Sequence, residues 1–262
     1  MTAAMELRGI TRRFGGLIAV DNVDLDVPVG EITGLVGPNG AGKSTTFACV
    51  GGQLRPTSGS VHWDGTDITG HPPERIARAG VARTFQTSRP IPGFSVLENV
   101  LVGASRLGKS SFLQDVFGGR RRNAEERDLR EQSMESLALV GLSEQANDAG
   151  TELPYGQRRL LEIARALVAK PTLLMLDEPA AGLNSAETER LGALLGKLAD
   201  SGIGVLLVEH NLGLVLGVCN RVAVLDFGKL IANGTPDEIS KDPEVIAAYL
   251  GGDGSGSADA EG

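Results

Sequence analysis

Gly37-Pro-Asn-Gly-Ala-Gly-Lys-Ser44 is the stretch that decides the fold of this 262-residue chain. It fits the pattern G-x-x-x-x-G-K-[ST], in which small residues let successive backbone N–H groups curl around a phosphate. The apolar run 32–37 predicts a buried strand leading into the loop, and residues 44–50 predict a helix whose N-terminus adds positive potential. Strand, loop and helix in this order predict a nucleotide site rather than a glycine-rich turn that binds nothing.

The loop also carries a cation and two hydroxyl groups suited to a magnesium nucleotide. Lys43 can reach the terminal phosphates, Ser44 supplies a hydroxyl oxygen for Mg²⁺, and Thr45 brings a second hydroxyl near the phosphates. The nucleotide-binding residues expected in the loop are Gly37, Pro38, Asn39, Gly40, Ala41, Gly42, Lys43, Ser44 and Thr45.

A later apolar run ends in two adjacent acids, in the stretch Leu173-Leu-Met-Leu-Asp177-Glu178-Pro179. Because side chains alternate along a strand, the two carboxylates should point to different places. Asp177 can then face Mg²⁺, directly or through water, and Glu178 an attacking water, which suits phosphoryl transfer. Alone, such a strand end is more often an ordinary exit into a loop. Beside a phosphate loop, the catalytic interpretation is favoured.

Three further side chains are candidates for contact with the nucleotide, on their positions in the sequence alone. Gln86 and His210 each follow a short apolar run, so in a parallel sheet both would reach the carboxyl edge of the strands, where ligands bind. Singly, each is more often structural. Phe14 can stack on a purine or fill a core, and its spacing leaves both open.

The segments around these motifs predict an α/β fold. Residues 23–27 alternate apolar and polar side chains, and residues 61–68 predict a hairpin, so the N-terminal part should be an antiparallel β sub-domain. Short apolar runs separated by helical patterns predict a parallel core of the P-loop NTPase type. These runs are 81–85, 173–176, 205–208 and 222–225.

The composition changes between residues 87 and 160, which predicts a helical sub-domain inserted into this core. Its charge run, from Arg120 to Glu131, is expected to be the solvated face of a helix. The last residues, 251–262, contain only glycine, serine, alanine and acidic residues, and predict a disordered acidic tail.

Overall composition excludes several classes of protein. The net charge of −8, from 25 basic and 33 acidic residues, argues against general nucleic-acid binding. Two cysteines, Cys49 and Cys219, are too few for a disulfide framework or a zinc ribbon and suit a reducing cytosol. No signal peptide is recognised at residues 1–8, and the apolar runs fall short of the ~20 residues of a membrane helix. Membrane association is therefore expected through a partner.

The order of these motifs resembles that of the ATP-binding-cassette (ABC) ATPases, whose core is RecA-like. The resemblance covers residue 5 to about residue 250 and implies a single ABC ATPase domain over 1–250. It makes Phe14 the aromatic that stacks on adenine and residues 37–45 the Walker A loop. It implies ATP and Mg²⁺ as ligands, with Glu178, His210 and Gln86 as catalytic residues. The implied metal ligands are Ser44, Gln86 and Asp177.

Leu153-Pro-Tyr-Gly-Gln157 stands where the family's signature belongs, and Ala181-Gly-Leu-Asn184 resembles its D-loop. The signature usually reads Leu-Ser-Gly-Gly-Gln and acts in trans, its serine contacting the γ-phosphate of ATP held by the opposite subunit. Here Pro154 replaces the serine and Tyr155 a glycine, and proline offers neither hydroxyl nor N–H. Pro154 can equally be a harmless start for a helix over 157–169. Leu153, Pro154, Tyr155, Gly156 and Gln157 are therefore expected to form a weakened rather than an inactive signature.

Within the family, the chain is most similar to the ATPase subunits of branched-chain (hydrophobic) amino-acid importers in prokaryotes. The stretches that carry this likeness are Ala82-Arg-Thr-Phe-Gln86, Tyr155-Gly-Gln-Arg-Arg-Leu-Leu-Glu-Ile-Ala-Arg165, Asp177-Glu-Pro-Ala-Ala-Gly-Leu-Asn184 and Ile231-Ala-Asn-Gly-Thr-Pro236. The resemblance implies a second ABC subunit, identical or similar, and integral-membrane permease subunits on the cytoplasmic side of the prokaryotic cell membrane. An extracytoplasmic solute-binding protein would be an indirect partner, and no nucleic acid is expected.

Other functions remain open at this level. Urea and amide importers share much of the same sequence pattern, and a soluble, non-transport ABC regulatory protein would carry the same cassette. Such soluble proteins usually have two cassettes or a long coiled coil, and this chain has one cassette. A GTPase or a soluble kinase would also use a phosphate loop, but the Asn-Lys-x-Asp sequence that typically binds guanine is missing.

Overall fold

The structure, a computed structural model, describes residues 3–84, 89–105 and 120–251. Its contacts divide the chain into two units, one of residues 1–73 with 195–262 and one of residues 74–194. Gln86 and the expected tail lie outside the described residues, except Gly251, which is the last residue of helix α9 (Pro243–Gly251).

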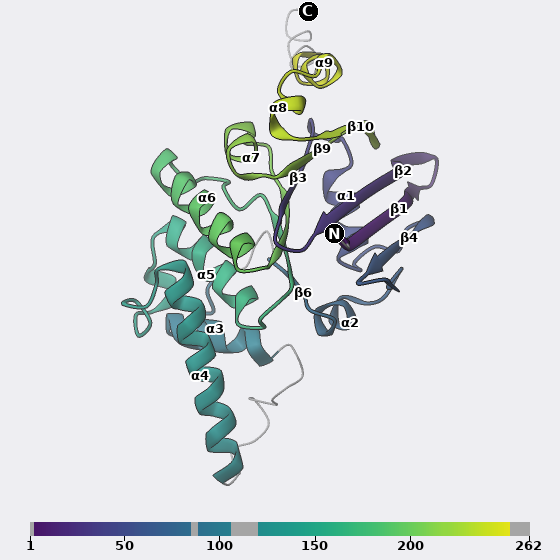
Figure 1. Cartoon of the computed structure of the whole chain (residues 1–262). Helices are drawn as coiled ribbons and strands as arrows, with labels where there is room; N and C mark the ends of the chain where they lie inside the picture. The colour runs from purple at the N-terminus through teal and green to yellow at the C-terminus, as the bar shows by residue number, and fades with distance from the viewer. Residues whose placement is uncertain (1–2, 85–88, 106–119, 252–262) are drawn as a thin grey trace, which may run out of the picture. The chain divides into compact units, whose positions relative to one another are not determined.

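The first unit opens with an antiparallel sheet of order β2-β1-β4-β5, in which β1, β2 and β4 lie side by side (Figure 1). Val23, Leu25 and Val27 are buried and alternate with exposed neighbours, which confirms the half-buried strand. Asp64 and Gly65 both have positive φ, at 47° and 73°, as a two-residue hairpin turn requires. The strands are β1 (Ala3–Phe14), β2 (Leu17–Pro28), β4 (Ser58–Trp63) and β5 (Thr66–Asp67).

A second group of strands in the first unit carries the phosphate loop. β3 lies between β8 and β9 and is parallel to both, which confirms the parallel core. β3 and β8 are buried along their whole length, as expected for near-continuous apolar strands of a parallel sheet, although β3 includes the buried polar residue Thr33. β10 pairs antiparallel with β9 and was not anticipated as a strand. The strands are β3 (Ile32–Val36), β8 (Gly204–Val208), β9 (Arg221–Asp226) and β10 (Lys229–Gly234).

Helix α1 (Lys43–Val50) contacts β1, β2 and β8, so it packs against both groups of strands. After β8, helix α7 (Leu212–Val218) packs against β3, and the short helix α8 (Pro236–Ile239) packs against β9 and β10. α8 begins with a capping box formed by Thr235 and Glu238, and α9 contacts β10. Helix α6 (Ser185–Asp200) crosses the boundary between the two units.

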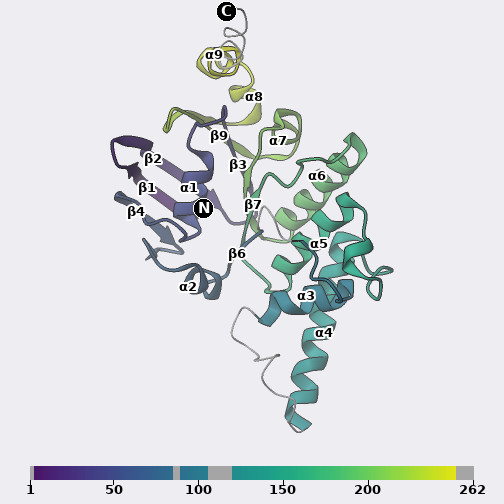
Figure 2. The same ribbon diagram turned by 180° about the vertical axis from the view of Figure 1, so that it is seen from behind.

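The second unit contains the parallel pair β6 and β7, visible side by side in Figure 2, and three helices that pack on one another. In α4 the described charges Arg127, Asp128, Arg130 and Glu131 are exposed, which agrees with a solvated face. The boundaries 87 and 160 for an inserted sub-domain stay a prediction. The elements are α2 (Pro73–Arg78), β6 (Val81–Arg83), α3 (Val96–Ser105), α4 (Arg120–Val140), the 3-10 helix η1 (Gly150–Glu152), α5 (Tyr155–Leu167) and β7 (Leu173–Asp177).

Within the described ranges, no helix is both long enough and apolar enough to cross a membrane.

Candidate functional site

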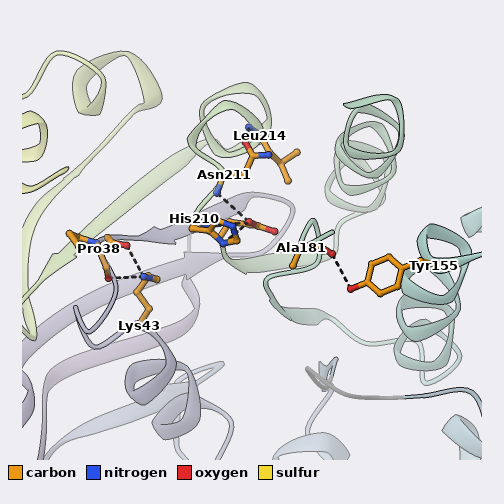
Figure 3. Close-up of polar contacts among 9 residues, drawn as sticks. Pro38, Lys43, Tyr155, Ala181, His210, Asn211 and Leu214 are labelled. Carbon is orange, nitrogen blue, oxygen red and sulfur yellow. Dashed lines mark hydrogen bonds and ion pairs between the residues drawn. The ribbon is translucent and has the colours of Figure 1, made fainter. Parts of the chain in front are cut away.

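The phosphate loop connects β3 to α1 and is closed by its own lysine. Lys43 is buried, and its ammonium group donates to the carbonyl oxygens of Gly37 at 2.6 Å and Pro38 at 2.9 Å (Figure 3). The N–H of Ala41 donates to Pro38 O at 3.2 Å, which tightens the turn. A buried cation in a backbone loop at a helix N-terminus is an arrangement suited to a polyphosphate. Ser44 is exposed and Thr45 half-buried at the start of the helix.

Two glycines of the loop are required by close contacts. A Cβ on Gly37, whose φ is 148°, would collide with the carbonyl oxygen of Leu225 in β9. A Cβ on Gly42, whose φ is 101°, would lie 2.5 Å from the carbonyl oxygen of Ala19 in β2. The loop therefore packs closely against β9 on one side and β2 on the other, and these contacts fix the positions of its N–H groups in the absence of ligand.

Phe14 is the last residue of β1 and is 43% exposed. The guanidinium carbon of Arg12 lies 4.5 Å from the centroid of its ring. A side chain exposed to this extent is not filling a core, which removes one of the two interpretations left open by the sequence. An exposed aromatic ring in the unit that carries the phosphate loop is available to stack on a purine.

His210 follows β8 by two residues, as expected for the carboxyl end of a parallel strand, and its side chain is 58% exposed. The residue before it, Glu209, is fully buried. One carboxylate oxygen of Glu209 accepts from the backbone N–H of His210 at 3.1 Å and of Asn211 at 3.3 Å, and lies 3.9 Å from His210 Nδ1 (Figure 3). Asn211 in turn caps α7 by accepting from Leu214 N at 3.0 Å. The histidine loop is thus held by backbone bonds to Glu209 and a helix cap.

Glu209 had no role in the interpretation of the sequence. Its position in the sequence could have indicated a structural role. A carboxylate directly after a buried apolar run and before a histidine needs hydrogen-bond partners there. The Glu209→Ala protein should be less stable by about 1–3 kcal/mol, since two part-buried hydrogen bonds from backbone N–H groups lose their acceptor. Glu209→Gln keeps an acceptor oxygen and should lose less. Urea unfolding of both variants checks this, and equal stability of the two would contradict the role of the acceptor.

In the second unit, β7 ends at Asp177, which is 5% exposed. Its Oδ2 lies 3.9 Å from Nη2 of Arg83, the last residue of the neighbouring strand β6. Burial lowers the pKa of Arg83, and the charge of Asp177 opposes that shift. A cation beside the carboxylate offsets part of the cost of burying it. Arg83 lies within the quoted stretch 82–86 but was not singled out there.

Glu178 lies just beyond the strand, half-buried, with φ of 48°. The N–H of Ala181 donates to its carbonyl oxygen at 3.2 Å, which closes a turn over residues 178–181. The sequence predicted that the two carboxylates point to different places because side chains alternate along a strand. That reason is wrong, because the strand ends at Asp177 and Glu178 lies beyond it. A left-handed residue, rather than the pleat of a strand, sets the direction of Glu178.

The signature segment forms the start of α5, which begins at Tyr155 rather than at Gln157. Leu153 is buried, Pro154 is exposed in the N-cap position with φ of −53°, and Gln157 is half-buried. Proline fits this place because its φ of −53° lies in the range that the proline ring allows. A Cβ on Gly156 would collide with the Glu187 carboxylate, so this glycine is required where α5 meets the start of α6.

The Ser44 hydroxyl and the Asp177 carboxylate are oxygen donors of the kind that Mg²⁺ prefers, so their chemistry fits the expected metal. Gln86, the third expected ligand, lies outside the described residues. The loop and His210 belong to the first unit, and the two acids and the signature belong to the second.

Two family models match the chain. The model described as ABC transporter matches residues 20–181. The model described as Branched-chain amino acid ATP-binding cassette transporter matches residues 229–255, which include β10 and α9.

Two curated relatives match nearly full length. The chain is 44% identical to the high-affinity branched-chain amino acid transport ATP-binding protein BraF of Pseudomonas aeruginosa, over 94% of this chain and 97% of that protein. It is 42% identical to the corresponding LivG protein of Escherichia coli K12, with the same shares covered. The structure is similar to the ADP conformation of MJ1267, an ATP-binding cassette of an ABC transporter, with a TM-score of 0.86 and 30% identity. That match covers 96% of this chain and all of the other.

Proposed function

Because the chain belongs to the ABC transporter family, we propose that it is the ATP-hydrolysing subunit of a membrane importer for branched-chain or other hydrophobic amino acids. The observation that carries the proposal is similarity over nearly the whole chain to proteins named for that transport, including the match at residues 229–255. The alternatives are a urea or amide importer ATPase and a soluble ABC regulatory protein.

ATP binds through the first unit in this proposal. The loop N–H groups and Lys43 hold the phosphates, with Thr45 beside them, and Phe14 stacks on the adenine. The support for Lys43 is its burial and its place among loop carbonyls. Ser44, Asp177 and Gln86 would hold Mg²⁺, which when bound neutralises charge on the phosphates.

Hydrolysis uses three side chains of this chain. Glu178 accepts a proton from the attacking water as general base. His210 stabilises the charge that develops on the γ-phosphate, and its loop is kept in place by Glu209 and the cap at Asn211. Gln86 senses the same phosphate and links it to the helices of the second unit.

Two cassettes, identical or similar, close head to tail around two ATP molecules in this proposal. Each subunit presents residues 153–157 to the ATP of the other, where the N-terminal dipole of α5 faces the phosphate even though Pro154 offers no N–H. Closure by ATP and release after hydrolysis make the dimer a switch. The helices of residues 87–160 receive a short helix of the permease on the cytoplasmic side of the membrane, and a solute-binding protein delivers the solute from outside.

Deletion of the gene for this chain tests the transport function. Uptake of labelled leucine should be lost, and it should be restored by the wild-type gene but not by the Glu178→Gln gene. Loss of urea or amide uptake instead would favour the first alternative. Unchanged uptake of all three solutes would favour a regulatory protein.

A further inference from the structure

Tyr155, at the signature position where the family usually has glycine, makes its contacts within its own subunit. The residue is 51% exposed, and its hydroxyl donates to the carbonyl oxygen of Ala181 at 3.1 Å (Figure 3). Its ring lies on Gly182, because a Cβ added there would come within 2.9 Å of Tyr155 Cε1. The phenol therefore joins the start of α5 to the segment that follows Glu178.

The segment 178–181 contains an unfavourable backbone conformation, which contacts with its surroundings must stabilise. Glu178 has the left-handed backbone conformation, with φ of 48°, which is unfavourable for a residue other than glycine. The turn is closed by the bond from Ala181 N to Glu178 O at 3.2 Å. The carbonyl of the same Ala181 receives the Tyr155 hydroxyl, so one peptide segment is held on both sides. Such unfavourable backbone conformations persist where surrounding contacts over-determine them.

The phenol itself is held in place by Arg159, one turn along α5. Nη2 of Arg159 donates to Tyr155 Oη at 3.2 Å, and its guanidinium carbon lies 5.6 Å from the ring centroid. Nη1 of Arg159 contacts Glu162 at 3.1 Å. The Tyr155 hydroxyl can thus accept from the guanidinium while donating to Ala181, and it has one proton to give.

We propose that Tyr155 is a positioning residue for Glu178: its hydroxyl fixes the Ala181 carbonyl and with it the turn that aims the Glu178 carboxylate. The kinetic part of this inference rests on the proposed function, whereas the structural part does not. The inference also gives the tyrosine a role in its own subunit that differs from the action of the signature on the partner's nucleotide.

Hydrogen–deuterium exchange of the nucleotide-free protein tests the structural part. In Tyr155→Phe, which removes only the hydroxyl, amides of residues 178–184 should exchange about threefold to tenfold faster than in the wild type. Ser143→Ala is the matched control, because it removes an exposed hydroxyl of the same unit that makes no side-chain hydrogen bond to the described residues, and it should leave exchange unchanged. Unchanged exchange in Tyr155→Phe overturns the proposal whether or not the protein hydrolyses ATP.

Steady-state ATP hydrolysis tests the kinetic part. Tyr155→Phe should lower kcat about threefold to tenfold with KM for ATP unchanged, because the ring and the groups of the phosphate loop stay in place and only the placement of Glu178 is loosened. Tyr155→Gly restores the usual signature glycine but removes the ring as well, and it should be slower still. A Tyr155→Gly protein at least as active as the wild type would overturn the proposal, because glycine cannot make the contact with the Ala181 carbonyl.

The two measurements separate the possible failures. A wild-type protein that neither binds nor hydrolyses ATP would contradict the proposed function, while faster exchange in Tyr155→Phe would still support the hydrogen bond from Tyr155 to Ala181. Faster exchange with unchanged kcat would overturn the positioning role.

Discussion

The Lys43→Met protein should bind MgATP about 10- to 100-fold more weakly than the wild type. The ammonium group of Lys43 is buried in the loop and bonded to the carbonyls of Gly37 and Pro38, so it is positioned among groups that surround a phosphate. Hydrogen bonds to charged groups contribute about 1.5–3 kcal/mol, which corresponds to that loss of affinity. Methionine keeps the bulk of the side chain, so the packing of α1 should survive.

Fluorescence titration with a labelled ATP analogue measures the affinity, and thermal unfolding without nucleotide reports on the fold. Lys241→Ala is the control, because it removes an exposed lysine between α8 and α9 and should bind like the wild type. Equal affinity in Lys43→Met and the wild type would remove Lys43 from the phosphate site.

Local patterns were sufficient to predict the loop and its flanking elements. A buried parallel strand is mostly apolar, and a loop position where backbone approaches backbone closely requires glycine. β3 and the loop glycines can therefore be recognised from neighbouring residues in the sequence. The strand end moved from Gly37 to Val36 and the helix start from Ser44 to Lys43. Helix ends shift by a residue without changing the chemistry.

Features that depend on contacts between distant segments could not be predicted. Whether Phe14 is buried depends on what packs against the end of β1, and its spacing carries no such information. The direction of the Glu178 side chain depends on the left-handed backbone conformation of Glu178 itself, and a glutamate in the sequence does not predict that conformation. The contact of Tyr155 with Ala181 joins residues 26 positions apart. These contacts exist only once the chain has folded.

Glu178→Gln should retain MgATP binding and lower the rate of hydrolysis by about 10²- to 10⁴-fold. Glutamine has nearly the same shape, so the turn over residues 178–181 should keep its form, but a neutral amide cannot accept the proton of the attacking water. The expected loss is the typical contribution of a general base. Phosphate release under saturating MgATP measures it. Glu189→Gln, on the exposed face of α6, is the control and should hydrolyse at the wild-type rate.

The same variant shows whether the Pro154 signature still closes on ATP. Light scattering should give a dimer with MgATP and a monomer with ADP or without nucleotide, because blocked hydrolysis keeps ATP between the two subunits. The double variant Lys43→Met, Glu178→Gln should remain monomeric under the same conditions, since closure depends on bound nucleotide. A Glu178→Gln monomer that still binds ATP would mean either that Pro154 has disabled the shared site or that closure needs the permease. Undiminished hydrolysis would remove Glu178 from the role of base.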